Sequence, residues 1–506
     1  MLAIGTKVYS DYGIAWDETY SRKTGLISYN YVFHNDNSLK TFKDKDYGVA
    51  FELPLIVAEK LLALDDSRDI FLMRHLFTHL FYLVGTVGLY ILLYILFESP
   101  FLALTGTIML LCNPLIYSHS FFNSKDIPLM SLFIICALSF VIAIKKQRVV
   151  YFILFGFLCG LLTNLRVIGI LFFGLTTVIA AIDFLINKQK TKILLCYVGF
   201  ALAFTITLIS SWPYLWDAPI QNLMTVIKNM SKFRWDRDVL FLGTFYKSNN
   251  LPWTYIPTWI GITTPLPYLF LFFSGMFFLI LRIIRHPELL FSNNVDRFLI
   301  VFFLIIIFPF IAIILLHSIV YDGWRHLYFI YPFIILVAVY GLNAYCKLIN
   351  HSNKIFIYCV TYGFLSIGVI KTVIFMIENH PYQNVYFNEI VSKKEQAIRN
   401  NFEMDYWGTS YKQALEYVVS NDESSVINIM VANDPGRYNA LILNSHERSK
   451  INFVDWAPGN LNLTDYVISN YRWHPKDYEF LPEKKYFNVK VLNSDIISVW
   501  KICKRD

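Results

Sequence analysis

Ten apolar runs, each long enough or nearly long enough to cross a lipid bilayer as a helix, occupy most of the chain. A membrane-spanning helix needs roughly 20 predominantly apolar residues. Charged residues make up only 16% of the sequence, too few to cover the surface of a soluble protein. The sequence therefore predicts an all-α polytopic membrane bundle of about ten transmembrane helices, at residues 77–97, 101–117, 127–144, 149–163, 167–186, 193–210, 265–281, 298–316, 327–345 and 355–376.

Cationic residues lie between the runs in an alternating pattern. Lys145, Lys146 and Arg148 follow the third run, Arg282 and Arg285 follow the seventh, and further cations follow the fifth and the ninth. Short loops rich in Lys and Arg face the cytoplasm in membrane proteins. The opposite, outer face then holds an acidic loop, residues 1–74, an aromatic loop, residues 212–264, and everything after the last run. Because the net charge of +7 reflects this asymmetry, nucleic acid is not expected as a partner.

The composition changes after the last run. The sequence becomes charged and mixed, and its periodicity predicts a helix at 410–420 and short strands at 426–431, 451–454, 466–469, 487–492 and 496–502. A stretch of this length and pattern is typical of a small α/β domain. We therefore expect two domains, a transmembrane domain at residues 1–376 and an outer-face α/β domain at residues 377–506.

Two adjacent acids, Asp17 and Glu18, lie in an aromatic stretch of the acidic loop. A carboxyl group in a partly dehydrated site has a raised pKa and can act as a general base. The alternative is a solvated loop, where most acids are found. The sequence has no P-loop, no dinucleotide-binding glycine motif and no HExxH motif, so ATP-driven transport, dinucleotide chemistry and zinc proteolysis are not indicated.

Asn123, Lys125 and Asp126 lie just before the third run, at the predicted outer surface. Asp126 is well placed to be a helix N-cap, because Pro128 follows in the first helical turn. An N-cap at the membrane surface can also face a functional site, so both interpretations stay open.

Tyr321, Asp322, Arg325 and His326 lie in the short outer segment between the eighth and ninth runs. An Arg and a His at the outer end of a helix can bind a lipid phosphate. They can also simply extend toward the lipid headgroups. Arg166, at another outer helix end, has the same two interpretations.

The aromatic loop begins at Trp212, and we expect it to include an amphipathic helix lying in the membrane interface. Aromatic side chains stack on sugars, but an interfacial aromatic belt explains these residues equally well. All of these polar and aromatic clusters fall on one predicted face of the membrane. That shared side favours a functional site there.

These residues resemble the polyprenyl-phosphate-sugar-dependent glycosyltransferases of the GT-C superfamily, which includes protein O-mannosyltransferases and lipid A aminoarabinose transferases. A bacterial branch labelled dolichyl-phosphate-mannose-protein mannosyltransferase-like is similar over nearly the whole chain. In relatives a further span precedes the acidic loop, so we expect this chain to lack that first span. The resemblance is carried by Asp17-Glu18, Asn123-Ser124-Lys125-Asp126, Arg166, Ser211-Trp212-Pro213, Gly323-Trp324-Arg325-His326, and the stretches 380–389 and 402–408.

The resemblance implies an inverting transfer of a sugar from a polyprenyl-phosphate donor to a hydroxyl of a protein, lipid or glycan. The expected location is a bacterial inner membrane, with the active site and the C-terminus on the periplasmic side. The sequence allows a divalent cation as a cofactor, but it assigns no ligands to that cation. The implied general base is Asp17, and Glu18 and Asp126 orient the acceptor, the base or a bound cation. The other candidates bind the donor phosphate (Arg325, His326, Arg166, Lys125) or the substrate (Asn123, Trp212, Tyr321, Asp322).

Two other functions are compatible with a membrane protein of this composition. A transporter, such as a flippase of lipid-linked sugars, has ionisable residues near the midplane and often has repeated halves. The apolar runs here contain almost no charge and form no repeated halves. A non-catalytic membrane scaffold would use the C-terminal domain to bind a partner, and only the one-sided acidic clusters argue against it.

Overall fold

The computed structural model describes residues 1–186, 189–231, 233–288, 294–348 and 354–502. Eight helical segments in these ranges are long and apolar enough to cross a membrane. They coincide with eight of the ten predicted runs and confirm the polytopic helical bundle. These segments are α5 (Ser67–Phe97), α8 (Asp126–Lys146), η1 with α10 (Val167–Gly169 and Ile170–Ile186), α11 (Lys190–Ser211), α14 (Leu266–Arg285), α16 (Asn294–Leu316), η3 with α17 (Arg325–Ile330 and Tyr331–Leu348) and α18 (Lys354–Glu378).

The two remaining runs differ from a simple span. The run at 101–117, predicted as one span, is two helices, α6 (Pro100–Leu111) and α7 (Pro114–Phe122), which bend by 66° at their junction. Proline lacks a backbone N–H and disfavours the helical conformation of the residue before it. Asn113 caps the new helix by accepting the N–H of Ile116 at 3.0 Å. The fourth run is α9 (Val149–Leu165), an apolar helix of 17 residues.

Glycines allow two pairs of helices to approach closely. A Cβ atom on Gly156 of α9 would lie 2.2 Å from the carbonyl oxygen of Phe200 on α11, and one on Gly275 of α14 would lie 2.0 Å from that of Val337 on α17. Small residues at such contacts are the usual means of close helix packing in membranes.

The two most buried spans are α8 and the segment formed by η3 and α17. Asp126 is the first residue of α8, and Arg325 is the first residue of η3. The core of the bundle therefore fixes the positions of two candidate site residues at one end of their helices.

The segment 1–74, predicted as an acidic loop, is largely helical. It contains α1 (Leu2–Val8), α2 (Glu18–His34), α3 (Ser38–Thr41), α4 (Glu52–Leu61) and the start of α5. Small residues of α2, including Gly25 and Ser28, are buried and let α2 pack on α4. The sequence pattern missed these helices because α2 has almost no apolar face, as in Ser28-Tyr29-Asn30-Tyr31.

The aromatic loop contains η2 (Pro213–Leu215), α12 (Pro219–Ser231), the antiparallel strands β1 (Asp238–Phe241) and β2 (Thr244–Lys247), and α13 (Tyr255–Thr263). The expected amphipathic helix is α12. Its apolar residues Ile220, Met224 and Ile227 lie three to four residues apart on one exposed face.

The C-terminal part contains the predicted small α/β fold. Its five-stranded sheet has the order β4-β3-β5-β7-β6, in which β3 is parallel to β4 and β5, and β7 is antiparallel to β5 and β6. The strands are β3 (Ile427–Val431), β4 (Ile451–Val454), β5 (Tyr466–Ser469), β6 (Phe487–Val491) and β7 (Ser494–Lys501). The helices are η4 (Gln383–Val385), α19 (Ala397–Asn401), α20 (Tyr411–Asn421), α21 (Asp434–Tyr438), η5 (Asn439–Ile442), α22 (Ser445–Ser449) and η6 (Pro458–Leu463).

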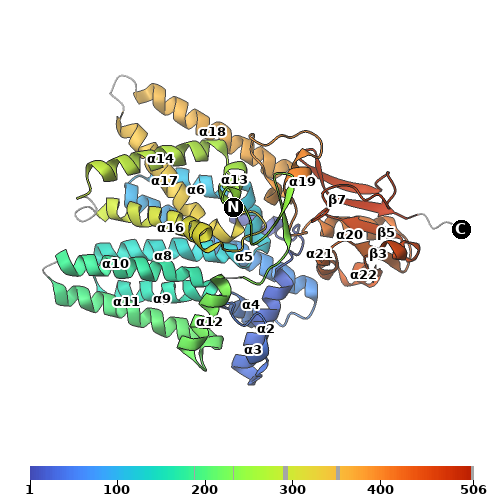
Figure 1. Ribbon diagram of the computed structural model, residues 1–506, viewed down its shortest axis with the longest axis horizontal. Coiled ribbons are helices and arrows are strands. Elements are labelled where there is room, and N and C mark those ends of the chain that lie inside the picture. Colours follow the sequence, from blue (N-terminus) through green and yellow to red (C-terminus); the bar gives the residue numbers. More distant parts are fainter. Residues whose placement is uncertain (187–188, 232, 289–293, 349–353, 503–506) are drawn as a thin grey trace.

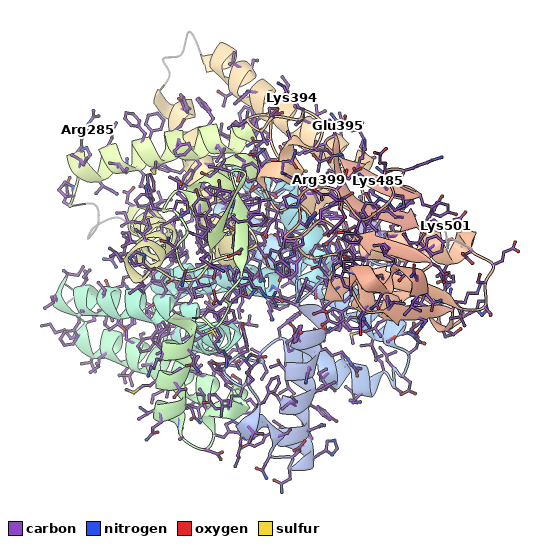
Figure 2. The ribbon with its side chains drawn as sticks, turned by 45° about the vertical axis from the view of Figure 1, so that its right-hand side comes forward. Arg285, Lys394, Glu395, Arg399, Lys485 and Lys501 are labelled. Carbon is purple, nitrogen blue, oxygen red and sulfur yellow. The ribbon has the colours of Figure 1, made fainter. Side chains whose placement is uncertain are left out.

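The bundle and the sheet occupy opposite ends of the molecule. Figure 1 shows the C-terminal strands at one end of the long axis and the far ends of α10, α11 and α14 at the other. In Figure 2, Arg285 lies at that far end, whereas Lys485 and Lys501 lie at the sheet end. The structure therefore separates the basic end of α14 from the C-terminal part, as the alternating cations predict.

Candidate active site

Four segments far apart in the sequence meet where the bundle contacts the C-terminal part. Helix α2 begins after Asp17, α8 begins at Asp126, α9 ends before Arg166, and η3 begins at Arg325. Their side chains, with three neighbours, form a continuous set of ion pairs. We call this set the charged cluster: Asp17, Lys125, Asp126, Arg166, Asp322, Arg325 and Arg472.

Asp17 is the most accessible carboxylate of the cluster, with 28% of its side chain exposed. Its Oδ2 accepts a hydrogen bond from Nη1 of Arg325 at 3.0 Å and lies 3.7 Å from Nζ of Lys125. Burial by itself would raise the pKa of the Asp17 carboxyl, but Lys125 and Arg325 hold that pKa well below its usual value. Asp17 is therefore ionised at neutral pH.

Asp126 is fully enclosed and is held by three neighbours. Nη2 of Arg166 lies 2.7 Å from its Oδ1, and Nη1 of Arg325 lies 3.6 Å from its Oδ2. Asn123 donates a hydrogen bond from Nδ2 to Oδ2 at 2.9 Å and accepts the Asp126 backbone N–H at 2.9 Å. Asn123, rather than Asp126, thus satisfies the free N–H groups where α8 begins. The Asp126 carboxylate faces the cluster instead of capping its helix.

Arg325 is the centre of the cluster. Only 2% of its side chain is exposed, and its guanidinium contacts the carboxylates of Asp17, Asp126 and Asp322. The ring centres of Tyr321 and Trp407 lie 4.9 and 4.6 Å from its guanidinium carbon. Cation–π contacts with these two rings hold the guanidinium in place.

The cluster contains four cations and three carboxylates, so it has a surplus positive charge. Beside it lies a small cavity of about 20 Å³, lined by Lys125, Arg166, Tyr47, Ser21 and Thr24 among others. About one fifth of the Lys125 and Arg166 side chains is exposed. The hydroxyl of Ser21 is buried and makes no hydrogen bond within the described residues. An anion entering here would meet two cations and a free hydroxyl, and also Glu52, whose carboxylate is already paired with Arg74 and Ser124.

Glu18 does not contact the charged cluster in the part of the chain that the structure describes. Its carboxylate accepts the backbone N–H of Ala15 at 2.7 Å and lies 3.0 Å from Nε2 of His75 on α5. The first contact closes the turn before α2, and the second holds that turn against α5. A catalytic role for Glu18 stays a prediction, while its contacts are those of a residue that fixes the Asp17 backbone.

Three further candidates lie at the edge of the cluster or outside it. Tyr321 stacks on Trp235, with ring centres 4.0 Å apart, and the ring of His326 packs edge-on against Tyr321 at 4.9 Å. Trp212 is buried at the end of α11, and the described residues show no contact between its side chain and the cluster. Arg166, by contrast, is in the cluster, close to that helix end.

Sequence reasoning missed Arg472, which joins the cluster from the C-terminal part. Its Nη2 donates to Oδ1 of Asp322 at 2.7 Å, and its guanidinium lies over the rings of Trp16 and Trp473. A signal was available, because Arg472 and Trp473 lie in the turn that begins two residues earlier, just after the predicted strand 466–469. The strand prediction did not indicate which element the following turn would contact.

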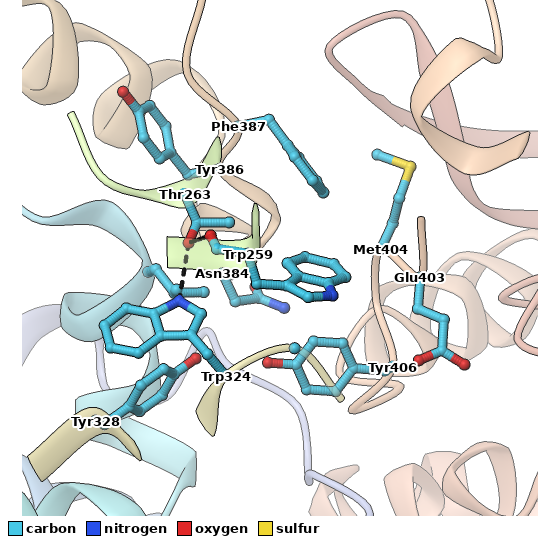
Figure 3. A pocket seen from close by; sticks show the side chains of 12 residues that line it. Trp259, Thr263, Trp324, Tyr328, Asn384, Tyr386, Phe387, Glu403, Met404 and Tyr406 are labelled. Atoms are coloured by element: carbon cyan, nitrogen blue, oxygen red, sulfur yellow. Dashed lines mark hydrogen bonds between the residues drawn. The ribbon is translucent and has the colours of Figure 1, made fainter. Parts of the chain in front are cut away.

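A buried aromatic pocket lies behind η3 (Figure 3). Trp324 donates a hydrogen bond from Nε1 to Oγ1 of Thr263 at 2.9 Å, and Trp259 and Tyr406 line the same space. Glu403 also lines it, and burial raises the pKa of the Glu403 carboxyl to about 8, with Arg472 opposing this increase. Glu403 is therefore mainly protonated at neutral pH.

The carboxylates of the cluster do not form a metal site. No group of three or more His, Cys, Asp and Glu side chains suited to a metal ion occurs among the residues in the described ranges. The guanidinium of Arg325 already lies between Asp17, Asp126 and Asp322. A divalent cation would have to displace this guanidinium. The three carboxylates therefore do not fit the divalent cation that the sequence analysis allowed.

The fold and the cluster define a class of protein: a polytopic helical membrane protein in which a small α/β part covers a charged site at one end of the bundle. The apo structure of ArnT from Cupriavidus metallidurans has this fold, with a TM-score of 0.50 and 11% sequence identity over 99% of this chain and 97% of that one. A second ArnT structure, bound to undecaprenyl phosphate, matches with a TM-score of 0.46, at 11% identity over 98% of this chain and 96% of that one.

The family model described as dolichyl-phosphate-mannose-protein mannosyltransferase matches residues 67–216, a range that includes Asn123, Lys125, Asp126 and Arg166. The apo oligosaccharyltransferase of Archaeoglobus fulgidus is similar at a TM-score of 0.47 and 10% identity over 90% of this chain, which spans 66% of that protein's length. No curated protein sequence matches the chain. The family match over residues 67–216 and the fold shared with the apo ArnT structure agree with the resemblance predicted from the sequence.

Proposed function

We propose that this protein is a membrane glycosyltransferase that transfers a sugar from a polyprenyl-phosphate donor to an acceptor hydroxyl. The observation that carries the proposal is the charged cluster at one end of an apolar bundle, in which two of the four cations contact a partly exposed, ionised aspartate. A phosphate on a lipid chain needs cations at the membrane surface, and a sugar transfer needs a carboxylate beside them.

Lys125 and Arg166 are the proposed first contacts of the donor phosphate, because both line the small cavity and are partly exposed. Arg325 lies deeper and stabilises the charge that grows on the phosphate as the sugar leaves. His326, beside Tyr321, is a further proposed phosphate contact. Tyr321, Asp322 and Asn123 are proposed to shape the substrate side, and a sugar contact from Trp212 stays a prediction.

The resting pKa of Asp17 is too low for an efficient base, because Lys125 and Arg325 stabilise its ionised form. A bound donor phosphate competes for these same two cations. Its negative charge and the loss of those contacts raise the pKa of Asp17 when the donor is present. In this proposal the donor itself activates the base.

The chemical step then follows from these positions. Asp17 accepts the proton of the acceptor hydroxyl as the acceptor oxygen bonds to the anomeric carbon. The bond from that carbon to the phosphate oxygen breaks, and its electron pair leaves on the polyprenyl phosphate. A single displacement of this kind inverts the anomeric configuration, as in inverting glycosidases.

The proposed orientation places the cluster and the C-terminal part on the outer, periplasmic side of a bacterial inner membrane. This orientation is supported by Arg282 and Arg285, which lie at the end of α14, far from the C-terminal sheet (Figure 2). Loops rich in such cations stay in the cytoplasm.

The test is a transfer assay with the purified full chain and a panel of undecaprenyl- and dolichyl-phosphate sugars. We expect release of free polyprenyl phosphate with at least one donor and loss of that release in Asp17→Asn. Movement of the intact donor across a vesicle membrane, without release, would contradict the proposal and favour a flippase. Neither release nor transport of any donor would leave the scaffold function as the better explanation.

A further inference from the structure

The chain from Ser10 to Trp16, which carries Asp17 into the cluster, has no helix or strand of its own. Such a segment is expected to be mobile unless other parts of the protein hold its backbone. Its position matters, because Asp17 must lie within hydrogen-bond reach of the acceptor. We call residues 10–16 the Asp17 loop.

Asn439 of the C-terminal part holds the middle of this loop. Its Oδ1 accepts the backbone N–H of Ile14 at 2.8 Å, and its Nδ2 donates to the carbonyl oxygen of Ile14 at 2.9 Å. The same amide group donates to the carbonyl oxygens of Gly408 and Pro435. Asn439 is fully buried, so one side chain joins the Asp17 loop to the turn at Gly408 and to α21 of the C-terminal part.

Neighbouring contacts leave the loop little room to move. A Cβ atom on Gly13 would lie 2.2 Å from the carbonyl oxygen of Thr409 and 2.3 Å from Oδ1 of Asn439. The backbone N–H of Trp16 donates to the carbonyl oxygen of Trp407 at 3.0 Å. Residues on both sides of Ile14 are therefore packed against the C-terminal part.

Two cationic side chains of the C-terminal part, Lys412 and Arg472, also contact the Asp17 loop. Lys412 donates from Nζ to the carbonyl oxygens of Ser10 and Asp11 at 2.5 and 3.2 Å. Arg472 lies over the ring of Trp16 and also binds Asp322, which in turn contacts Arg325. The C-terminal part thus contacts both the backbone that carries Asp17 and the cation that binds the Asp17 carboxylate.

We propose that the C-terminal part positions the general base, with Asn439 as the main positioning residue of the Asp17 loop and Lys412 as a second one. This inference rests on the proposed function, in which Asp17 is the base. It assigns the C-terminal part a role within the transfer site, since Asn439 reaches the reaction only through Ile14 and Asp17.

The experiment compares Asn439→Ala with Asn428→Ala in the purified full chain. Asn428 lies on β3 and hydrogen-bonds Asp465 and Asn452, away from the Asp17 loop, so its replacement is a matched control for loss of an asparagine from this part. Hydrogen–deuterium exchange of the peptide covering residues 10–17 reports the loop. Steady-state kinetics with a donor that is active in the transfer assay report the base.

We expect Asn439→Ala to speed exchange in residues 10–17 about tenfold, because Ile14 loses both side-chain hydrogen bonds. We expect kcat to fall at least about tenfold while KM for the donor changes less than about threefold, since a shift of about 1 Å in a catalytic group has large effects on rate. Lys125 and Arg166, which bind the phosphate, keep their places. Asn428→Ala should alter neither quantity.

Unchanged exchange in residues 10–17 would overturn the inference, and so would faster exchange with an unchanged kcat. A parallel rise in KM and fall in kcat in both variants would point to general destabilisation and also overturn it. If Asn439→Ala does not fold, Lys412→Met tests the same loop through Ser10 and Asp11, with an expected fall in kcat of about threefold. Absence of transfer by the wild-type chain would refute the proposed function instead, a result distinguishable because no variant is involved.

Discussion

Two charged regions lie at opposite ends of the helical bundle and differ in how their charges are shared. At the far end, Arg282 binds both carboxylate oxygens of Asp296, at 2.7 and 3.0 Å, and Arg297 lies 2.6 Å from Asp183. Each of these arginines has a carboxylate of its own. In the charged cluster, Arg325 is divided among three carboxylates, and the cations outnumber the acids.

The difference indicates different roles. A bidentate or closely matched ion pair satisfies the hydrogen-bonding groups of both side chains, so few of these groups are left to bind a ligand. A shared guanidinium within a cation-rich group can exchange one carboxylate for an incoming anion at low cost, because other contacts remain. We therefore expect substitutions at the far end to change stability and substitutions in the cluster to change transfer.

The largest expected effect is on catalysis. Asp17→Asn removes the proposed base while keeping the size of the side chain and should lower kcat about 100- to 10,000-fold. The matched control is Asp44→Asn, a half-exposed aspartate of the same segment that pairs with Arg234 rather than with the cluster. Membrane insertion of Asp17→Asn should be unchanged, while its Tm should fall modestly because the variant loses the charge that Lys125 and Arg325 stabilise. Wild-type turnover in this variant would remove Asp17 from the mechanism.

The next largest expected effect is a loss of stability, caused by a substitution at the far end of the helical bundle. Arg297→Gln leaves Asp183 buried without its closest cation and should lower stability by about 3–5 kcal/mol. Thermal unfolding in detergent measures the loss, and kcat per folded molecule should stay at the wild-type value. The double variant Asp183→Asn/Arg297→Gln should recover part of the stability. A fall in kcat per folded molecule, at unchanged stability, would break the distinction between the two regions.

A smaller effect is expected at the edge of the cluster. Lys125→Met keeps the length of the side chain, removes one proposed phosphate contact, and should raise KM for the donor about 10- to 100-fold, the worth of one charge-assisted hydrogen bond. Lys40→Met is a control, since Lys40 is a more exposed lysine of the outer part and pairs with Asp217. Equal KM values in Lys125→Met and the wild type would exclude Lys125 from phosphate binding.

The last effect is a pH dependence of stability, at a buried carboxyl outside both charged regions. The folded chain holds Glu403 protonated up to a pKa of about 8, whereas the carboxyl of an unfolded chain ionises near 4.5. The wild type therefore loses stability as the pH rises between these values, by up to about 1.4 kcal/mol per pH unit. Glu403→Gln does not titrate, so its Tm relative to the wild type should rise from pH 5.5 to pH 8.

Glu395→Gln is the control for this pH experiment, because Glu395 is an exposed carboxylate of the same part, paired with Lys490. The same pH-dependent gain in Glu395→Gln, or no gain in Glu403→Gln, would show that Glu403 is not held protonated by the fold.

The sequence predicted the spans and the strands because both depend on local patterns. Runs of apolar residues must be helical in a bilayer, since only a helix satisfies its own backbone there, and alternating runs between turn residues form strands. The predicted helix at 410–420 and strands 451–454 and 466–469 accordingly match α20, β4 and β5 within a residue. The break between α6 and α7 also had a local sequence signal, Asn113-Pro114. The continuous apolar run at 101–117 nevertheless led to the prediction of a single span.

The candidate site was only partly predictable. Lys125, Asp126, Arg166 and Arg325 could be selected because they lie at the predicted outer ends of apolar runs, and Asp17 because it lies beside Glu18 in an aromatic stretch. The structure brings all five together. Glu18, adjacent to Asp17 in the sequence, faces His75 instead, because successive residues at a helix start point in different directions.

By itself, the sequence determined that this chain forms a polytopic helical bundle with a small α/β part, and that its unusual charges lie at one end of the helices. Only the tertiary structure decided which charges meet. Arg472 and Asn439 are hundreds of residues from Asp17, and they reach its loop because the C-terminal part packs on the end of the bundle. Local patterns encode which face of an element is buried, but contacts between distant turns arise only when the whole chain has packed.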